Sequence, residues 1–482
     1  MFRPRIQCIS KRYRADDGGS VHSIVEKQGT SLLNALGALL QCVLGPGRCA
    51  ISPNGDFPYD PYLDVLPKGN LVSIATAVPK LIPQMLLDPS VIEDPYPFYR
   101  RLVQEAPVWH IDGTDIVVVS SFEAVNEAVR RTGDFSSNLL AFLFRNHDGT
   151  PGVEAFDPGI QALATADPPR HTVHRKAVFP ELVAKRMLTL RDEIEEIAAR
   201  HVLAAFAQPQ VDAMSAIANP VPIRVVSKLI GFRNEDPDEL QRAAFRTTSM
   251  LSGTRPREQQ TIAMEDALNS VVWIAEQLDD AINGGPAEGI LEIIASAVNG
   301  GEIEADEAFA VMATLLSAGG ETTTGLIGNA IHLLATRPRL QADLRQRPKA
   351  LGPFIEEMLR LESPLRYHMR HSRRATSLQG VDVPAGATLL LLWGAANRDP
   401  AEYDRPDDLV LDRPTPKLHL GFGRGVHYCV GAPLARLEAE VILTEVLQRT
   451  VRFELDPDDS PVREHSLAVR RFTHLPLCVS AS

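Results

Sequence analysis

The sequence predicts a mainly α-helical fold with small β-sheets, and three observations carry this prediction. Apolar residues recur at helical spacing through most of residues 180–365. Helix and strand patterns can be recognised from residue 93 to the end of the sequence. Short apolar runs separated by turn signals occur toward both ends of this region, at residues 108–119 and 380–394. Neither an internal repeat nor a linker divides this region. We therefore expect a single domain over residues 85–482, preceded by an extension over residues 1–84.

The elements that open and close this domain can be placed in order. Apolar residues at helical spacing follow Glu93, and Pro107 marks the end of that helix. The next two apolar runs flank an Asp-Gly dipeptide, which is typical of a tight hairpin turn. Helical spacing over residues 304–335 predicts one long helix. Residues 380–394 carry Pro-Ala-Gly between two apolar runs and predict a second short hairpin.

The extension is rich in glycine, proline and serine and contains no motif that indicates a site. Its one membrane-like stretch, residues 32–44, would cover only about 20 Å as a helix, whereas a bilayer core is about 30 Å thick. Asp16, Asp17 and Glu26 precede this stretch, and acidic residues are untypical of a signal peptide. We therefore expect an amphipathic or irregular extension and no membrane span.

Composition narrows the class of protein. The formal net charge of -12, with no long basic run, disfavours nucleic acid as a partner. The five cysteines are too sparse, and odd in number, for a disulfide framework. They indicate a reducing, cytoplasmic location.

Cys429 is a lone thiol in a glycine-rich stretch that runs into a helical pattern. Gly421, Gly423 and Gly425 let the backbone pass close to a flat or bulky group. The N–H groups and dipole of the following helix favour thiolate over thiol. A thiolate with backbone room around it suits a metal that takes one protein ligand, and haem iron is the leading case. The alternative is a structural cysteine in an all-helical interaction protein that binds no haem.

The run Phe422-Gly423-x-Gly425-x-His427-x-Cys429-x-Gly431 resembles the haem-binding loop of the cytochrome P-450 superfamily. The resemblance covers about residues 93–482 and points to soluble bacterial members of actinobacterial type. It implies haem b (iron protoporphyrin IX) with Cys429 as the iron ligand and with Phe422 and Gly423 beside the cofactor. It also implies the superfamily's fold, a triangular helical domain that encloses the buried haem.

Residues 317–325, SAGGETTTG, resemble the superfamily's distal-helix motif. Gly319-Gly320 weakens the helical hydrogen-bond ladder, and the Thr322 hydroxyl can satisfy a freed carbonyl. That opens a notch in which oxygen can sit. The resemblance gives Glu321 and Thr322 the roles of an acid and an alcohol that relay protons during oxygen activation.

The resemblance assigns further residues to three sets. Haem propionates need cationic or hydrogen-bonding partners, and the matched positions are His171, Arg175, Arg370 and His427. Contacts from the distal helix to the cofactor are assigned to Ala318 and Gly319. A structural ion triad, rather than a surface pair, is assigned to Glu357, Arg360 and Arg413. The substrate pocket is assigned to the variable segment 135–149 and to Thr314, Leu365, Arg366, His368, Leu467, Ala468 and Val469.

Two of the pocket residues, Arg366 and His368, are unusually polar for a pocket that binds apolar molecules. We therefore form the hypothesis that one of them holds a polar or anionic end of the substrate. The alternative is that both point to solvent or to a propionate.

The activity that the resemblance implies is insertion of one atom of O2 into a small organic substrate. No flavin or iron–sulfur motif occurs, so electrons would arrive from a ferredoxin or similar donor. We expect it to dock near Cys429, where Arg424 and Arg436 offer positive charge to it, and we expect a monomer. The alternatives are a peroxide-driven peroxygenase or dehydratase and a haem sensor, and the intact Glu321-Thr322 pair disfavours both.

Overall fold

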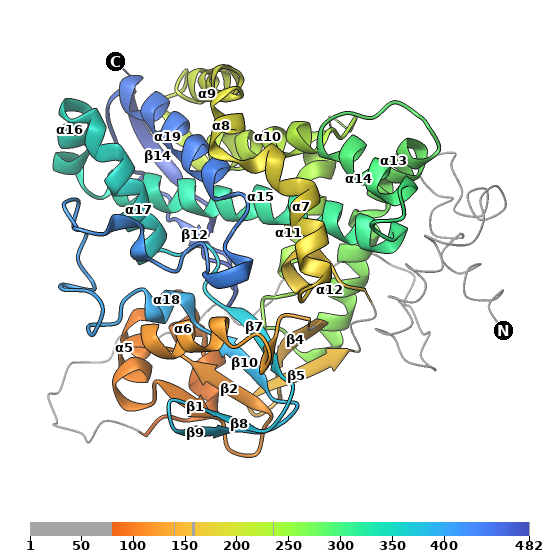
Figure 1. Cartoon of the computed structure of the whole chain (residues 1–482). Coiled ribbons are helices and arrows are strands. Elements are labelled where there is room, and N and C mark those ends of the chain that lie inside the picture. Colours follow the sequence, from red (N-terminus) through yellow and green to blue (C-terminus); the bar gives the residue numbers. More distant parts are fainter. Residues whose placement is uncertain (1–79, 139, 157–159, 235, 482) are drawn as a thin grey trace, which may run out of the picture.

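The computed structural model describes residues 80–138, 140–156, 160–234 and 236–481, shown in colour in Figure 1. Nearly all of the extension, including residues 32–44, lies outside this range. Within it, no helix combines the length and apolar character that crossing a membrane requires. Helices dominate the described chain and small sheets gather near its two ends, which confirms the predicted fold class.

The principal helices share the upper part of the molecule in Figure 1. They are α7 (Arg170–Leu182), α8 (Ala184–Leu188), α9 (Arg191–Ala205), α10 (Pro220–Ile230), α11 (Pro237–Ser249), α12 (Arg257–Ser270), α13 (Val272–Ile282), α14 (Gly289–Asn299), α15 (Ala305–Ala335), α16 (Pro338–Gln346), α17 (Leu351–Leu361) and α19 (Ala432–Gln448). The shorter helices α4 (Pro89–Glu93), α5 (Tyr96–Glu105), α6 (Phe122–Arg130) and α18 (Trp393–Ala396) accompany the sheet below.

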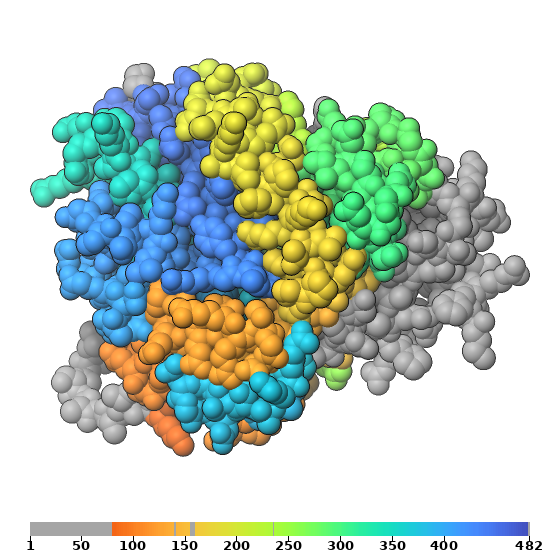
Figure 2. All heavy atoms as spheres, viewed as in Figure 1, coloured from red at the N-terminus to blue at the C-terminus, as the bar shows by residue number. Residues whose placement is uncertain are grey.

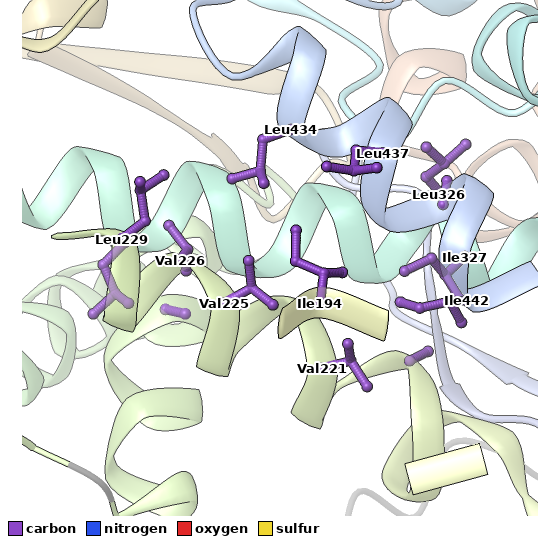
Figure 3. Close-up of a cluster of buried hydrophobic side chains, with 14 of the residues drawn as sticks. Ile194, Val221, Val225, Val226, Leu229, Leu326, Ile327, Leu434, Leu437 and Ile442 are labelled. Carbon is purple, nitrogen blue, oxygen red and sulfur yellow. The ribbon is translucent and has the colours of Figure 1, made fainter. Parts of the chain in front are cut away.

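Helix α15 forms the centre of the fold and confirms the long helix predicted over residues 304–335. A capping box between Glu304 and Glu307 begins it. Figure 3 shows α10 below it and α19 above it, with Val226, Ile327 and Leu437 among the apolar side chains that fill the layers between them. The helix is therefore fixed from two sides along most of its length.

The glycine pair of α15 serves close packing between helices. The helix continues through Gly319 and Gly320 without a break. A Cβ at Gly319 would lie 2.6 Å from Val226 of α10, and one at Gly320 would lie 3.1 Å from Ala244 of α11. The absence of side chains at these positions lets α10 and α11 approach α15.

The main sheet has the order β1-β2-β10-β7-β3. Strands β1 (Val108–His110) and β2 (Ile116–Val119) pair antiparallel, and Gly113 between them has φ 76°, which confirms the first hairpin. Strand β3 spans Phe135–Ser136, β7 spans His368–Ser372 and β10 spans Thr388–Leu391.

The second predicted hairpin, at residues 380–394, is wrong. Strand β9 (Val381–Val383) pairs with β8 (Thr376–Leu378), whereas β10 lies between β2 and β7. Gln379 and Gly380 have φ values of 47° and 77°, and two consecutive residues of positive φ are typical of a two-residue hairpin turn. The Pro-Ala-Gly stretch instead carries the chain from one sheet to another.

Three smaller sheets complete the fold. Strands β4 (Leu140–Arg145) and β5 (Pro151–Phe156) form a hairpin in the segment predicted to line the substrate pocket. Strands β11 (Thr450–Leu455), β14 (Pro476–Ala481) and β6 (Gln210–Asp212) form one sheet, and β12 (Val462–Arg463) pairs with β13 (Phe472–His474).

Candidate functional site

The stretch between His419 and Gly431, here called the Cys loop, folds back on itself just before α19. Gly423 and Gly425 have φ values of 66° and 73°, which favour glycine. The Cys429 N–H donates to the Phe422 carbonyl at 2.9 Å and closes the loop. Figure 2 shows the face on which α7 (yellow), α6 (orange) and the blue C-terminal part of the chain meet.

The Cys429 sulfur is turned toward the start of α19, where backbone N–H groups are available. Burial raises the pKa of Cys429, while hydrogen bonds from the Gly431 and Ala432 amides and the charges of Arg175 and Arg436 act to lower it. The amides at the start of α19 therefore act in the predicted direction, toward the thiolate, while burial acts against them. Coordination to a metal ion deprotonates a cysteine thiol outright.

Most residues of α15 are buried, but one face of the helix carries a stripe of residues that are accessible to solvent. Thr314, Ala318 and Thr322 are four residues apart and therefore lie on one face. Ala318 is exposed although Ser317 and Gly320 beside it are buried. The Thr322 hydroxyl donates to the Ala318 carbonyl at 2.6 Å, and the Thr314 hydroxyl donates to the Ala310 carbonyl at 2.7 Å. This stripe includes the predicted cofactor contact Ala318, whereas Gly319 packs against α10.

The four predicted propionate ligands lie together with His368. The His171 and His427 rings are 4.3 Å apart, and Arg370 Nη1 lies 3.1 Å from His368 Nδ1. Arg175 donates to the Tyr428 carbonyl at 2.9 Å and so reaches the Cys loop from α7.

This cluster of cationic groups lowers the pKa of His427. Burial, followed by the charges of Arg370, His171, His368 and Arg175, lowers it to about 2. The His427 Nε2 atom is buried and has no hydrogen-bond partner among the described residues. The guanidinium groups of Arg175 and Arg370 near this unpaired ring nitrogen fit an anionic ligand, so these residues fit a haem with its two carboxylates. His368 belongs to this cluster through its contact with Arg370.

Glu321 is buried and bonded to residues that local sequence patterns do not reveal. Arg471 Nε lies 2.6 Å from the Glu321 carboxylate, and Arg471 also bonds Glu464 at 2.8 Å. Burial raises the pKa of Glu321 to about 7, although Arg471 acts to lower it. The second carboxylate oxygen of Glu321 is buried without a partner among the described residues. Arg471 arrives from the far end of the chain, so only the tertiary structure identifies it.

The hypothesis that Arg366 holds an anionic substrate group is wrong. Its side chain is 2% exposed and donates to the carbonyls of Leu467 at 3.0 Å and Ile92 at 3.1 Å, and also to that of Ser466. Backbone carbonyls therefore occupy these donors. Four of the other predicted pocket residues pack in one apolar cluster, with Leu365 bridged to Val469. They are Leu365, Leu467, Ala468 and Val469.

The predicted ion triad lies beneath the Cys loop and is almost fully enclosed. Glu357 and Arg360 are each 1% exposed and pair at 2.8 Å, and Arg413 joins Glu357 at 2.8 Å. Arg360 further donates to the carbonyls of Asn397 and Asp408. The surface-pair alternative is excluded, because both side chains of the first pair are buried.

The predicted docking charge on Arg436 is neutralised. Its Nε and Nη2 atoms donate to the Glu356 carboxylate, at 2.6 and 2.9 Å. Arg424 remains on this face, with its guanidinium 5.8 Å from the Phe122 ring centroid. The surface near Cys429 is more apolar than predicted, since Val426 is 44% exposed and Tyr428 39%.

Comparisons with known proteins agree on one family. The family model described as cytochrome P-450 matches residues 349–471. Cytochrome P-450 144 from Mycobacterium tuberculosis is 41% identical over 391 residues, which is 80% of this chain and 89% of that protein. The cytochrome P-450 monooxygenase PikC from Streptomyces venezuelae is 34% identical over 79% of this chain and 90% of its own. The solved structure of CYP108D1 from Novosphingobium aromaticivorans is 28% identical, with TM-score 0.70 over 83% of this chain and 98% of its own.

Proposed function

The chain belongs to the cytochrome P-450 family, and from this premise we propose that it is a haem-dependent monooxygenase acting on a small organic molecule. The observation that carries the proposal is the position of Cys429, whose sulfur accepts hydrogen bonds from the Gly431 and Ala432 amides beside a cluster of cationic side chains. Hydrogen bonds to a thiolate ligand tune the metal that it binds. The activity inserts one atom of O2 into the substrate.

The residues of the chain that would hold haem b divide into two groups. Cys429 would supply the iron ligand, and His171, Arg175, Arg370 and His427 would bind the propionates. When bound, the haem supplies the oxygen-activating redox chemistry, and a thiolate ligand favours cleavage of the O–O bond. The exposed Ala318 would face the ring from α15.

Thr322 and Glu321 have separate tasks in moving protons. The Thr322 hydroxyl is bonded to the Ala318 carbonyl on the accessible stripe, so it can orient water there. The carboxyl of Glu321, with its pKa of about 7, can both take up and release a proton near neutral pH. Arg471 holds that carboxyl through Nε and bonds Glu464 through Nη2.

Thr322→Ala is expected to bind haem normally but to lose coupling between electron use and product formation. General acid–base groups contribute roughly 10²-fold or more to a step, so we expect peroxide release to replace most product formation. The measurement is peroxide formed per electron pair, in the presence of a compound that gives a substrate-type spectral shift. Ser317→Ala is the matched control, because its hydroxyl also bonds a carbonyl four residues back in α15, at 2.9 Å. Equal peroxide yields in Thr322→Ala and wild type would contradict the relay.

Electrons would come from a separate ferredoxin or similar donor that meets the chain near the Cys loop. The exposed Val426 and Tyr428 would supply apolar contact area there, with Arg424 as the remaining charge. We further propose that the chain acts as a monomer in the cytoplasm.

The first test is a carbon monoxide difference spectrum of the dithionite-reduced full-length protein, expressed with a haem precursor. A strongly red-shifted Soret band is expected, because thiolate ligation produces it and histidine ligation does not. A band of the histidine type would favour the haem sensor. A protein that takes up no haem would contradict the proposed function and would indicate that Cys429 is a structural cysteine.

A further inference from the structure

Glu356, next to the Glu357 of the buried triad, forms a second and separate network on α17. It is 5% exposed and accepts a hydrogen bond from His419 Nε2 at 2.8 Å. Arg436 of α19 binds the same carboxylate at 2.6 and 2.9 Å. The network therefore connects α17, the first residue of the Cys loop and the helix that follows the loop.

Both His419 and Arg436 contact other residues of the Cys loop directly. On one side, the Gly421 N–H donates to His419 Nδ1 at 3.1 Å, so both ring nitrogens of His419 are in use. On the other side, the Arg436 guanidinium lies 4.5 Å from the Phe422 ring centroid. Phe422 is the residue whose carbonyl accepts the Cys429 N–H. Arg436 also contacts the Tyr428 hydroxyl at 3.4 Å.

The network places two opposite charges beside the Cys loop. Burial would raise the pKa of Glu356, but hydrogen bonds from His419 and Arg436 outweigh it and hold the value at about 2. Burial likewise acts to lower the pKa of Arg436, and its hydrogen bonds to Glu356 and Tyr428 raise it. The carboxylate and the guanidinium are therefore both charged at neutral pH. The positive charge of Arg436 therefore lies beside Phe422 and Tyr428 of the Cys loop, with the negative charge of Glu356 next to it.

We propose that Glu356, His419 and Arg436 are positioning residues that fix the Cys loop and set the reduction potential of iron bound to Cys429. This inference rests on the proposed haem-thiolate function. It gives Arg436 a role other than attraction of an electron donor, because its charge is committed to Glu356. Reduction adds negative charge at the iron and its ligand, so the balance between this buried cation and its carboxylate partner affects the potential.

The test measures the midpoint reduction potential of the haem-loaded full-length protein in three variants. Glu356→Gln leaves the Arg436 cation uncompensated and is expected to favour the reduced state about fivefold, which is roughly 40 mV upward at 59 mV per tenfold for one electron. Arg436→Gln is expected to shift the potential downward. The double variant is expected to return close to wild type, because both charges are then removed.

Two further variants separate charge from packing. Arg436→Lys keeps the charge but loses the two-point contact, and is expected to keep a potential near that of wild type. Asp280→Asn removes an exposed ion pair, with side chains 45% and 47% accessible, and is expected to leave the potential unchanged. If Glu356→Gln does not fold, the comparison of Arg436→Lys with Arg436→Gln still decides the question.

The possible results separate a failure of this inference from a failure of the monooxygenase function on which it rests. Unchanged potentials in haem-loaded Glu356→Gln and Arg436→Gln, or equal shifts in Arg436→Lys and Arg436→Gln, would overturn the inference and leave the monooxygenase assignment intact. A wild-type protein that shows no thiolate-type carbon monoxide band would instead overturn the proposed function.

Discussion

Cys429→Ser is expected to abolish the red-shifted carbon monoxide band and to slow turnover on the order of 10³-fold, which corresponds to about 4 kcal/mol in the barrier. Serine lacks the thiol that becomes the metal-binding thiolate, so the electron donation that favours O–O cleavage is lost. The measurement is the difference spectrum together with product formation, each normalised to bound haem. Because the propionate ligands remain, the variant is expected to retain part of its haem.

Cys478→Ser is the matched control for that experiment. Cys478 lies in β14, and it and Cys429 are the free cysteines of the described chain. Its substitution is expected to leave both the band and turnover unchanged. A red-shifted band that survives in Cys429→Ser but disappears in Cys478→Ser would refute the assignment of the iron ligand.

Glu357→Ala is expected to destabilise the fold by about 3–5 kcal/mol, because it leaves a buried cation without its partner. Arg360, which is 1% exposed, and Arg413 both bond this carboxylate, and the Val410 N–H also donates to it at 2.9 Å. The site is the place where α17 holds the segment that leads into the Cys loop. Urea unfolding of haem-loaded protein, followed by circular dichroism, measures the loss.

Glu196→Ala is the control for this prediction. Glu196 pairs with Arg200 on the surface of α9, with side chains 77% and 66% accessible. Exposed ion pairs contribute about 0–1 kcal/mol, so this change is expected to have almost no effect. A loss of similar size in both variants would argue that the triad is not a special stabilising feature.

Several elements were predictable from short stretches of sequence, because interactions between neighbouring residues determine them. The limits of α15 were predictable from helical periodicity, and the β1–β2 hairpin from its Asp-Gly turn. The Glu357–Arg360 pair lies three residues apart on one helix face, so its contact follows from helix geometry alone. The Cys loop was recognisable by its glycines, of which Gly423 and Gly425 adopt positive φ values that few other residues can adopt.

Predictions failed where the partner of a residue is distant in sequence. Arg366 was assigned to the substrate because its sequence neighbours do not show that carbonyls of Leu467 and Ile92 take its donors. Arg436 was assigned to an electron donor, although Glu356, eighty positions earlier, binds it. The prediction of a hairpin at residues 380–394 was wrong for a related reason. The backbone hydrogen bonds of β10 are made with β2 and β7, which are distant in sequence.

The sequence by itself determined the family. It also predicted the iron ligand and the acid–alcohol pair, because these depend on residue types at short, fixed spacing. Only the tertiary structure decided what each charged group contacts. Helix and strand packing brings Arg471 to Glu321, and places His171 and Arg370 close to His427. Charges buried at such junctions need partners, and which partner is near depends on how elements far apart in the chain pack together.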